Sequence, residues 1–230
     1  MKISKKRKAT QPLFDRIKKY SLTEAVDVLK KFPRSKFDET VEVALNLNLN
    51  PKDASQIIRG TAALPHGTGK KLRVLVFCKS DRESDAKEAG ADFAGSDELV
   101  KKVAGGWCDF DVAIATTAMM KEIAKLGRVL GPRGLMPNPK TGTVTDDIKK
   151  TVKEVKAGKI EFKMDKQSGI HVGVGKLSFS NEALAENIKK LLNAVFSSNS
   201  SMNKPQSVKS IVISTTMGPG VKLDISEFRK

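Results

Sequence analysis

Cysteine, histidine and aromatic residues are scarce in this sequence of 230 residues. It contains two cysteines, two histidines and a single tryptophan, and aromatic side chains make up 5% of the chain. Cys78 and Cys108 stand among apolar neighbours with no histidine nearby, so we expect reduced cysteines in or near a core, and neither a disulfide nor a zinc site. The shortage of aromatic side chains argues against the stacking platforms of sequence-tolerant single-strand binders.

Long apolar runs are also missing. No stretch approaches the roughly 20 apolar residues that span a bilayer, and the basic N-terminal segment lacks the apolar core of a signal peptide. We therefore expect a cytoplasmic protein that does not enter a membrane. Positive charge is in large excess, with 42 Lys and Arg against 26 Asp and Glu and a formal net charge of +16. This surplus favours a polyanionic partner, with nucleic acid the first candidate and an anionic membrane surface the second.

The first part of the chain has the pattern of an α+β domain. Ser21, with Glu24 three residues later, predicts the capped start of a helix that continues to Phe32. In residues 40–50, apolar side chains alternate with Glu, Ala and Asn, which predicts a strand with one wet face in an antiparallel sheet. A second strand is expected over residues 57–64, before a break rich in glycine.

The middle of the chain has a different pattern. Residues 72–78 are apolar apart from Arg73, as in a strand covered on both faces, and residues 111–115 predict another short buried strand. Helices are expected over residues 81–90, 97–104, 117–127 and 145–158. Gly127 is expected to close the third of these helices, and Thr145 to cap the fourth. Strands that alternate with helices predict a small three-layer α/β unit.

After residue 158 the first pattern returns. We expect a hairpin over residues 159–179 with its turn near 166–169, a helix capped by Ser180, and two strands around a Gly-Pro-Gly turn. The fold class is therefore mixed, α/β and α+β, with two domains. Residues 1–67 and 159–230 form a discontinuous, split α+β domain, and residues 68–158 form an inserted α/β domain. The split domain carries most of the positive surplus, so most phosphate contacts are expected there.

Motifs for nucleotide binding and catalysis are incomplete. The sequence "HGTGK" at residues 66–70 is too short for a P-loop and precedes a strand instead of a helix. The strand at 72–78 is followed by acidic residues instead of a glycine fingerprint, so an anionic cofactor would lie beside Asp81, Glu83 and Asp85. There is no nucleophile elbow, Cys–His pair or HExxH helix. We expect no enzyme activity, cofactor or metal. A nucleotide-dependent enzyme and a nonspecific DNA binder are the rival hypotheses.

Three small features fit a structural and a functional interpretation alike. Phe37, just before the first strand, suits a core position capping the sheet as well as a surface position. The position of His171 fits either an ordinary surface residue or a donor to an RNA phosphate or 2′-hydroxyl. Residues 215–217, "TTM", stand beside a glycine turn where hydroxyls and bare backbone can approach a ribose-phosphate chain, although an ordinary turn is slightly favoured on chemistry alone.

The most unusual stretch, "LGRVLGPRGLMPNPKTG" at residues 126–142, combines glycine and proline with basic residues. Pro132, Pro137 and Pro139 fix φ and disfavour helix, so we interpret the stretch as a rigid scaffold loop of the inserted domain. Whether it also contacts RNA is left open by the sequence.

Several long motifs resemble those of one protein family, in the same order. They are "KFDETVEV", "RGTAALPHGTGK", "AGADFAG", "WCDFDVAIAT", "LGRVLGPRGLMPNPKTGTV", "AGKIEFKMDK" and "TTMGP". On these motifs the chain resembles the L-one family of large-subunit ribosomal proteins, in its bacterial form, over nearly its whole length.

The resemblance implies an RNA-binding split domain and a Rossmann-like insert, in a protein that is a monomer within the ribosome. It implies binding to large-subunit ribosomal RNA at the mobile stalk beside the tRNA exit site, help in the release of deacylated tRNA, and repression of the protein's own operon through its messenger RNA. Carried over by motif, the expected RNA contacts are Lys36, Phe37, Thr40, His171, Thr216, Met217 and Gly218.

Overall fold

The chain divides into two compact units in the computed structural model. The model describes residues 5–33, 35–51, 53, 56–198 and 207–228. Residues 1–69 and 160–230 form one unit, here called the outer unit, and residues 70–159 form the other, here called the inserted unit. The mixed fold class expected from the sequence is confirmed, with antiparallel strands in the outer unit and parallel strands in the inserted unit.

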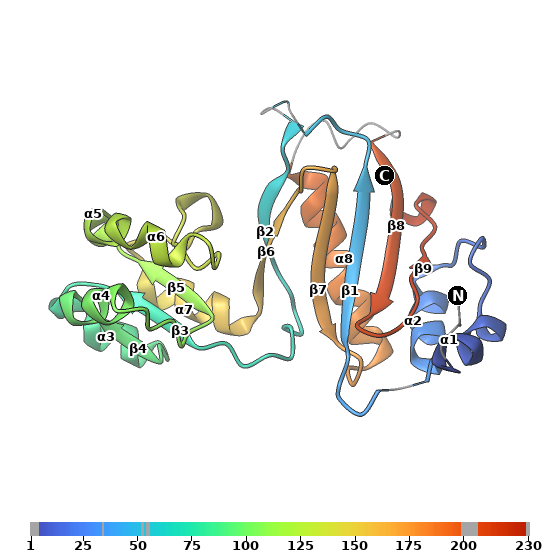
Figure 1. The fold of residues 1–230 in the computed structure, drawn as a ribbon, viewed down its shortest axis with the longest axis horizontal. Helices are drawn as coiled ribbons and strands as arrows, with labels where there is room; N and C mark the ends of the chain where they lie inside the picture. Colours follow the sequence, from blue (N-terminus) through green and yellow to red (C-terminus); the bar gives the residue numbers. More distant parts are fainter. Residues whose placement is uncertain (1–4, 34, 52, 54–55, 199–206, 229–230) are drawn as a thin grey trace. The chain divides into compact units, whose positions relative to one another are not determined.

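A four-stranded antiparallel sheet is the frame of the outer unit. Its strand order is β7-β1-β8-β9, formed by β7 (Gly169–Lys176), β1 (Thr40–Leu47), β8 (Val208–Thr215) and β9 (Val221–Lys222). Strand β1 is central, and its side chains alternate between the core and solvent as the sequence predicts. The pairing of β1 with β7 and β8 thus joins segments that are far apart in the sequence (Figure 1).

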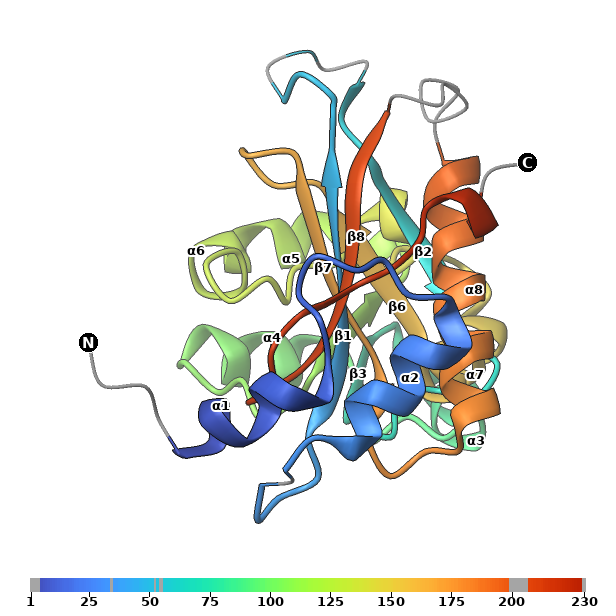
Figure 2. The same ribbon diagram turned by 90° about the vertical axis from the view of Figure 1, so that its right-hand side faces the viewer.

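Two helices cover one face of this sheet. Helix α2 (Leu22–Lys31) and helix α8 (Asn181–Ser197) lie on the same side, where their apolar residues complete the core (Figures 1 and 2). The expected caps are confirmed: Ser21 and Glu24 form a capping box, and the Ser180 side chain accepts from Ala183 N. The opposite face of the sheet carries the exposed residues of β1 and β7.

The prediction of a hairpin over residues 159–179 is wrong. Strand β6 (Lys159–Lys163) pairs with β2 (Arg59–Ala63) in a separate two-stranded sheet, whereas β7 pairs with β1. The turn itself is present, because Asp165 accepts hydrogen bonds from the backbone N–H groups of Gln167 and Gly169. It redirects the chain from one sheet into another.

The inserted unit is the three-layer α/β structure that the sequence predicts. Its parallel sheet has the order β4-β3-β5, with β3 (Val74–Phe77) between β4 (Phe93–Gly95) and β5 (Val112–Ala115). Helices α3 (Glu83–Glu88) and α7 (Ile148–Ala157) pack on one face, and α4 (Asp97–Ala104), α5 (Met120–Ile123) and α6 (Gly127–Leu130) pack on the other. The short strand β4 was not expected from its sequence.

The segment from residue 117 to residue 130 differs from its expected form. Gly127 does not close a helix, because its φ of −54° is helical and α6 continues to Leu130. The segment is a chain of short pieces, η4 (Thr117–Met119), α5, η5 (Ala124–Leu126) and α6. With η6 (Pro139–Thr141) further on, the stretch 126–142 is partly helical and not a loop throughout.

Helix α7 begins one residue after Asp147, which is its cap. The Asp147 side chain accepts from Lys150 N, whereas Thr145, the expected cap, accepts from Asp147 N. Gly158 ends the helix with a φ of 108°, as expected. The remaining described helices are α1 (Lys5–Thr10), η1 (Gln11–Leu13), η3 (Ser80–Arg82) and η8 (Ser226–Phe228).

The two cysteines and the tryptophan lie in or near a core, as their sequence contexts predict. Cys78 is buried, Cys108 is half-buried, and both are free thiols. Trp107 packs against the core of the inserted unit, edge-to-face with Phe93 at 4.9 Å between ring centroids.

Candidate nucleic-acid interface

The start of β1 and the end of β8 lie side by side because the two strands are antiparallel and Val41 pairs with Thr215. Residues 35–40 and 215–218, here called the rim segments, therefore meet at one end of the sheet (Figure 1). Six of the seven residues expected to bind RNA gather there: Lys36, Phe37, Thr40, Thr216, Met217 and Gly218.

Hydrogen bonds between Thr40 and Thr216 hold the rim segments in register. Thr216 N donates to Thr40 O at 3.1 Å, and Thr40 N donates to the Thr216 hydroxyl at 3.0 Å. The Thr216 hydroxyl is also 3.3 Å from Thr40 O. The exposed side chain of Thr216 therefore hydrogen-bonds Thr40 and helps to hold the two rim segments together.

The first rim segment contains a buried carboxylate, the side chain of Glu39. Its side chain is 3% exposed and accepts from Ser35 N at 3.0 Å and from Met217 N at 3.2 Å. Burial acts to raise the pKa of Glu39, but hydrogen bonds from Ser35, Thr215 and Met217 outweigh it, and the pKa lies below its ordinary value. The charged carboxylate thus ties one rim segment to the other.

Two large apolar side chains of the rim segments face solvent. Phe37 is 54% exposed and Met217 is 63% exposed. The alternative in which Phe37 is a core residue is therefore wrong.

Gly218 completes the turn for a steric reason. Its N–H donates to Thr215 O at 3.1 Å, and a Cβ atom at this position would lie 2.3 Å from the Thr215 hydroxyl oxygen. A side chain at position 218 would displace the residue that hydrogen-bonds Glu39.

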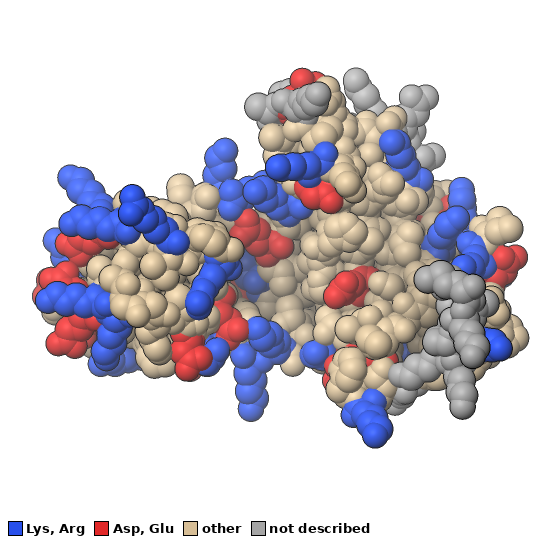
Figure 3. Space-filling view, viewed as in Figure 1, with Lys and Arg blue, Asp and Glu red and all other residues tan. Residues whose placement is uncertain are grey.

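Positive charge at the rim comes from two different strand ends. Lys36 is exposed, and Lys176, at the end of β7, donates to the Thr40 hydroxyl at 2.9 Å. Because that hydroxyl accepts from Lys176, its own hydrogen remains available to donate. In the space-filling view, the face of the β7-β1-β8 sheet carries few Lys or Arg side chains, which gather at its margins (Figure 3).

His171 is not part of this cluster. It is exposed on β7, opposite Ala44, which is four residues along β1 from Thr40, or about 13 Å at ~3.3 Å per residue. Its neighbourhood is the turn at Asp165, whose pKa is lowered by backbone hydrogen bonds from Gly169 and Gln167 and by the nearby His171. Between His171 and the rim, this sheet face carries Gly173 and the exposed Glu42, which pair with each other.

The structure adds two residues that the motifs did not single out. Glu39 stands inside the "KFDETVEV" motif, whereas Lys176 lies outside the family motifs, in the segment 159–179 that was expected to form a hairpin. An acidic residue is not an expected part of an RNA site. Only the burial of Glu39 and its hydrogen bond from Met217 N show that it supports the rim segments.

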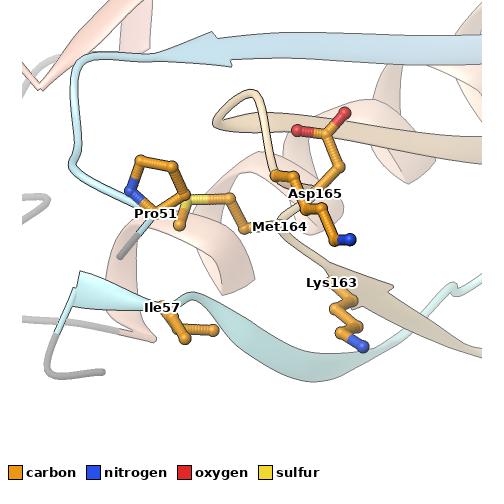
Figure 4. Close-up of a pocket in the computed structure, with 6 residues that line it drawn as sticks. Pro51, Ile57, Lys163, Met164 and Asp165 are labelled. Atoms are coloured by element: carbon orange, nitrogen blue, oxygen red, sulfur yellow. The ribbon is translucent and has the colours of Figure 1, made fainter. Parts of the chain in front are cut away.

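Other candidate sites are weaker. Within the described residues there is no cluster of three or more metal-ligating side chains, and no described helix is long and apolar enough to cross a membrane. A hollow of about 430 Å³ in the outer unit is lined by Pro51, Ile57, Lys163, Met164, Asp165 and Lys166 (Figure 4). It contains none of the expected site residues.

Known proteins match the chain over nearly its whole length. The model of the Ribosomal protein L1p/L10e family matches residues 29–219. The large ribosomal subunit protein uL1 of Protochlamydia amoebophila (strain UWE25) is 54% identical over 213 residues, covering 93% of this chain and 90% of the relative. The proteins of the same name from Chlamydia trachomatis serovar D and Chlamydia abortus are both 51% identical, covering 98% and 93% of this chain and 97% and 92% of the relatives.

Proposed function

The chain belongs to the Ribosomal protein L1p/L10e family, and on that premise we propose that it is a structural component of the large ribosomal subunit that binds ribosomal RNA through its rim segments. As a member of a ribosomal protein family it is not an enzyme, which removes the rival hypothesis of a nucleotide-dependent enzyme. The observation that carries the proposal is the pair of exposed apolar side chains, Phe37 and Met217, on a rim that is locked from below by Glu39.

The rim offers the kinds of group that recognise RNA. Lys36 and Lys176 can neutralise backbone phosphates. The Thr40 hydroxyl and the backbone of the 216–218 turn can address 2′-hydroxyl groups, which distinguish RNA from DNA. Phe37 and Met217 then form a dry patch that shields these hydrogen bonds from water.

The finer functions follow from family membership and are part of the same proposal. The RNA site is the mobile stalk of the large subunit, beside the tRNA exit site, and the bound protein assists release of deacylated tRNA. The same rim binds the messenger RNA of the protein's own operon and represses its translation. His171 contributes a separate contact further along the open sheet face, since it lies away from the rim.

Replacement of Met217 by alanine tests the site. We expect Met217→Ala or Phe37→Ala to weaken binding of a stalk RNA fragment by about 1–3 kcal/mol, as for contacts at the centre of an interface. Met136→Ala is a matched control, because Met136 is also exposed, at 37%, but lies in the inserted unit. Unchanged RNA affinity in a correctly folded Met217→Ala protein would contradict the proposal.

Competition between nucleic acids tests the choice of RNA over DNA. Affinity for the stalk fragment is measured against an unrelated RNA hairpin and duplex DNA at matched salt concentrations. We expect the stalk fragment to bind most tightly and its affinity to fall with salt as phosphate contacts are lost. Equal affinity for duplex DNA would favour the nonspecific DNA binder instead.

A further inference from the structure

A small crevice lies at the carboxyl ends of strands β3 and β5 in the inserted unit. Lys79 follows β3 and Thr116 follows β5, and both line a cavity of about 260 Å³ with Asp81, Arg82, Ala118 and Asp146. The chain leaves β3 toward α3 on one face of the sheet, and leaves β5 toward α5 on the other. Adjacent strands whose connections diverge in this way open the crevice where α/β sheets bind ligands.

Thr116 lines this crevice, and its hydroxyl oxygen is buried and unpaired among the described residues. The residue is 3% exposed, and its side-chain oxygen has no hydrogen-bond partner among the described residues. Its backbone is ordinary, since Thr116 N donates to Phe77 O at 3.1 Å. A buried hydroxyl without a partner lowers stability, and a valine would fill the same space without that cost. A ligand group that hydrogen-bonds this hydroxyl would remove that cost.

The charged groups of the crevice are of both signs. Arg82 donates to Asp146 O at 3.0 Å, and the Asp146 carboxylate accepts from the Thr117 hydroxyl at 2.9 Å. Asp81 is exposed, and Lys79 is exposed without an ion pair among the described residues. Cations suit a phosphate group, and carboxylates and hydroxyls suit the hydroxyl groups of a sugar.

We propose that this crevice binds a single ribonucleotide unit, with its phosphate on the side of Lys79 and Arg82 and its ribose hydroxyls toward Thr116 and the carboxylates. A dinucleotide is excluded, because the turn after β3 has no glycine fingerprint to approach its pyrophosphate. The ribonucleotide unit has two sources, a free nucleotide or a nucleotide of a bound RNA chain.

Binding of the four nucleoside 5′-monophosphates to the full-length protein tests the proposal. We expect at least one of them to bind in titration calorimetry and raise the melting temperature, and to bind at least tenfold more tightly than inorganic phosphate. Phosphate binding as tight as that of the nucleotides would refute the ribose contacts. A tetraribonucleotide separates the sources: tighter binding of the tetranucleotide indicates RNA, and tighter binding of the monophosphate indicates a free nucleotide. No binding of either probe overturns the proposal.

Thr116→Val distinguishes a ligand-binding hydroxyl from a structural one. We expect the variant to melt at the same or a higher temperature and to bind the nucleotide at least tenfold more weakly. Thr151→Val is the matched control, because Thr151 is also buried but its hydroxyl donates to Asp147 O at 3.0 Å. It should lower the melting temperature and leave nucleotide affinity unchanged. Undiminished nucleotide binding by Thr116→Val would refute the site.

Lys79→Gln tests the phosphate side of the crevice. We expect about tenfold weaker nucleotide binding, whereas Lys87→Gln, an exposed lysine of α3 outside the cavity lining, should bind as the parent protein does. Equal losses in the two variants would indicate general electrostatic attraction and contradict the site.

Discussion

Glu39→Gln is the substitution that tests most directly how the rim segments are held together. The change keeps the size of the side chain but removes its charge and turns one acceptor oxygen into an NH₂ group. In the protein both carboxylate oxygens accept backbone hydrogen bonds, one from Ser35 N and the other from Met217 N. The glutamine therefore leaves one of these N–H groups facing a donor.

The expected destabilisation follows from that lost bond. A hydrogen bond to a charged group contributes about 1.5–3 kcal/mol, and Glu39 is nearly fully buried, so little solvent screening reduces it. We expect the free energy of unfolding of the outer unit to fall by about 2–3 kcal/mol. With an m value of roughly 2 kcal/mol/M in urea, the midpoint falls by about 1 M. Because Met217 N loses its anchor, RNA affinity should fall by about tenfold.

The difference between Glu39 and glutamine should depend on pH. The pKa of Glu39 is lowered in the folded protein, so its stabilisation is fully present above the unfolded-state pKa of about 4.3. It is lost as pH falls through the lower folded-state pKa. The stability gap between parent and Glu39→Gln is therefore expected to be largest near pH 7 and to shrink below about pH 4.

Urea denaturation followed by two probes measures this effect. Trp107, the single tryptophan, reports on the inserted unit by fluorescence, whereas far-ultraviolet circular dichroism reports on both units. We expect Glu39→Gln to shift the circular dichroism transition and leave the Trp107 transition in place. Glu42→Gln, at an exposed position on β1 three residues after Glu39, should change stability by less than about 0.5 kcal/mol. A gap that is the same at pH 3.5 and pH 7, or absent at pH 7, would refute the assigned role of Glu39.

Three further predictions concern the rest of the fold. Gly127→Ala should raise stability by about 0.5–1 kcal/mol in thermal or urea denaturation, because Gly127 is helical and the nearest atom to an added Cβ is 3.8 Å away; a loss would contradict the helical assignment. Asn187→Ala should destabilise the outer unit by about 3–5 kcal/mol, since the fully buried amide makes three hydrogen bonds to backbone groups, and a loss under 1 kcal/mol would contradict this. Burial raises the pKa of the Cys78 thiol, so iodoacetamide should modify Cys108 first and Cys78 only on unfolding, as mass spectrometry of the digested protein would show.

Features of the fold that depend on near neighbours were predictable from the sequence. The capping box at Ser21 and the cap at Ser180 were found because a cap and its partner lie within four residues of each other. The alternation in residues 40–47 identified a half-exposed strand, and the apolar run ending at Phe77 identified a buried one. Both parts of the mixed fold class followed from these two patterns.

Strand pairing was the part of the fold that could not be predicted in full. Consecutive strands commonly pair, which favoured a hairpin between β6 and β7. Instead Met164 N donates to Ile58 O, and β7 continues the sheet beside β1. The choice of partner depends on contacts more than 100 residues apart, which no local pattern encodes. The strand β4, three residues long, gave too short a pattern to recognise.

For the candidate site too, some features follow from the sequence and others only from the tertiary structure. The sequence by itself determined the chemistry available: lysines, threonines, a phenylalanine and a methionine beside two turns, in motifs that identify the family. Only the tertiary structure decided that Phe37 and Met217 face solvent, that Glu39 lies beneath them, and that His171 stands apart. The physical reason is that exposure and pairing are set by what distant segments cover, whereas propensity and capping are set within a few residues of the chain.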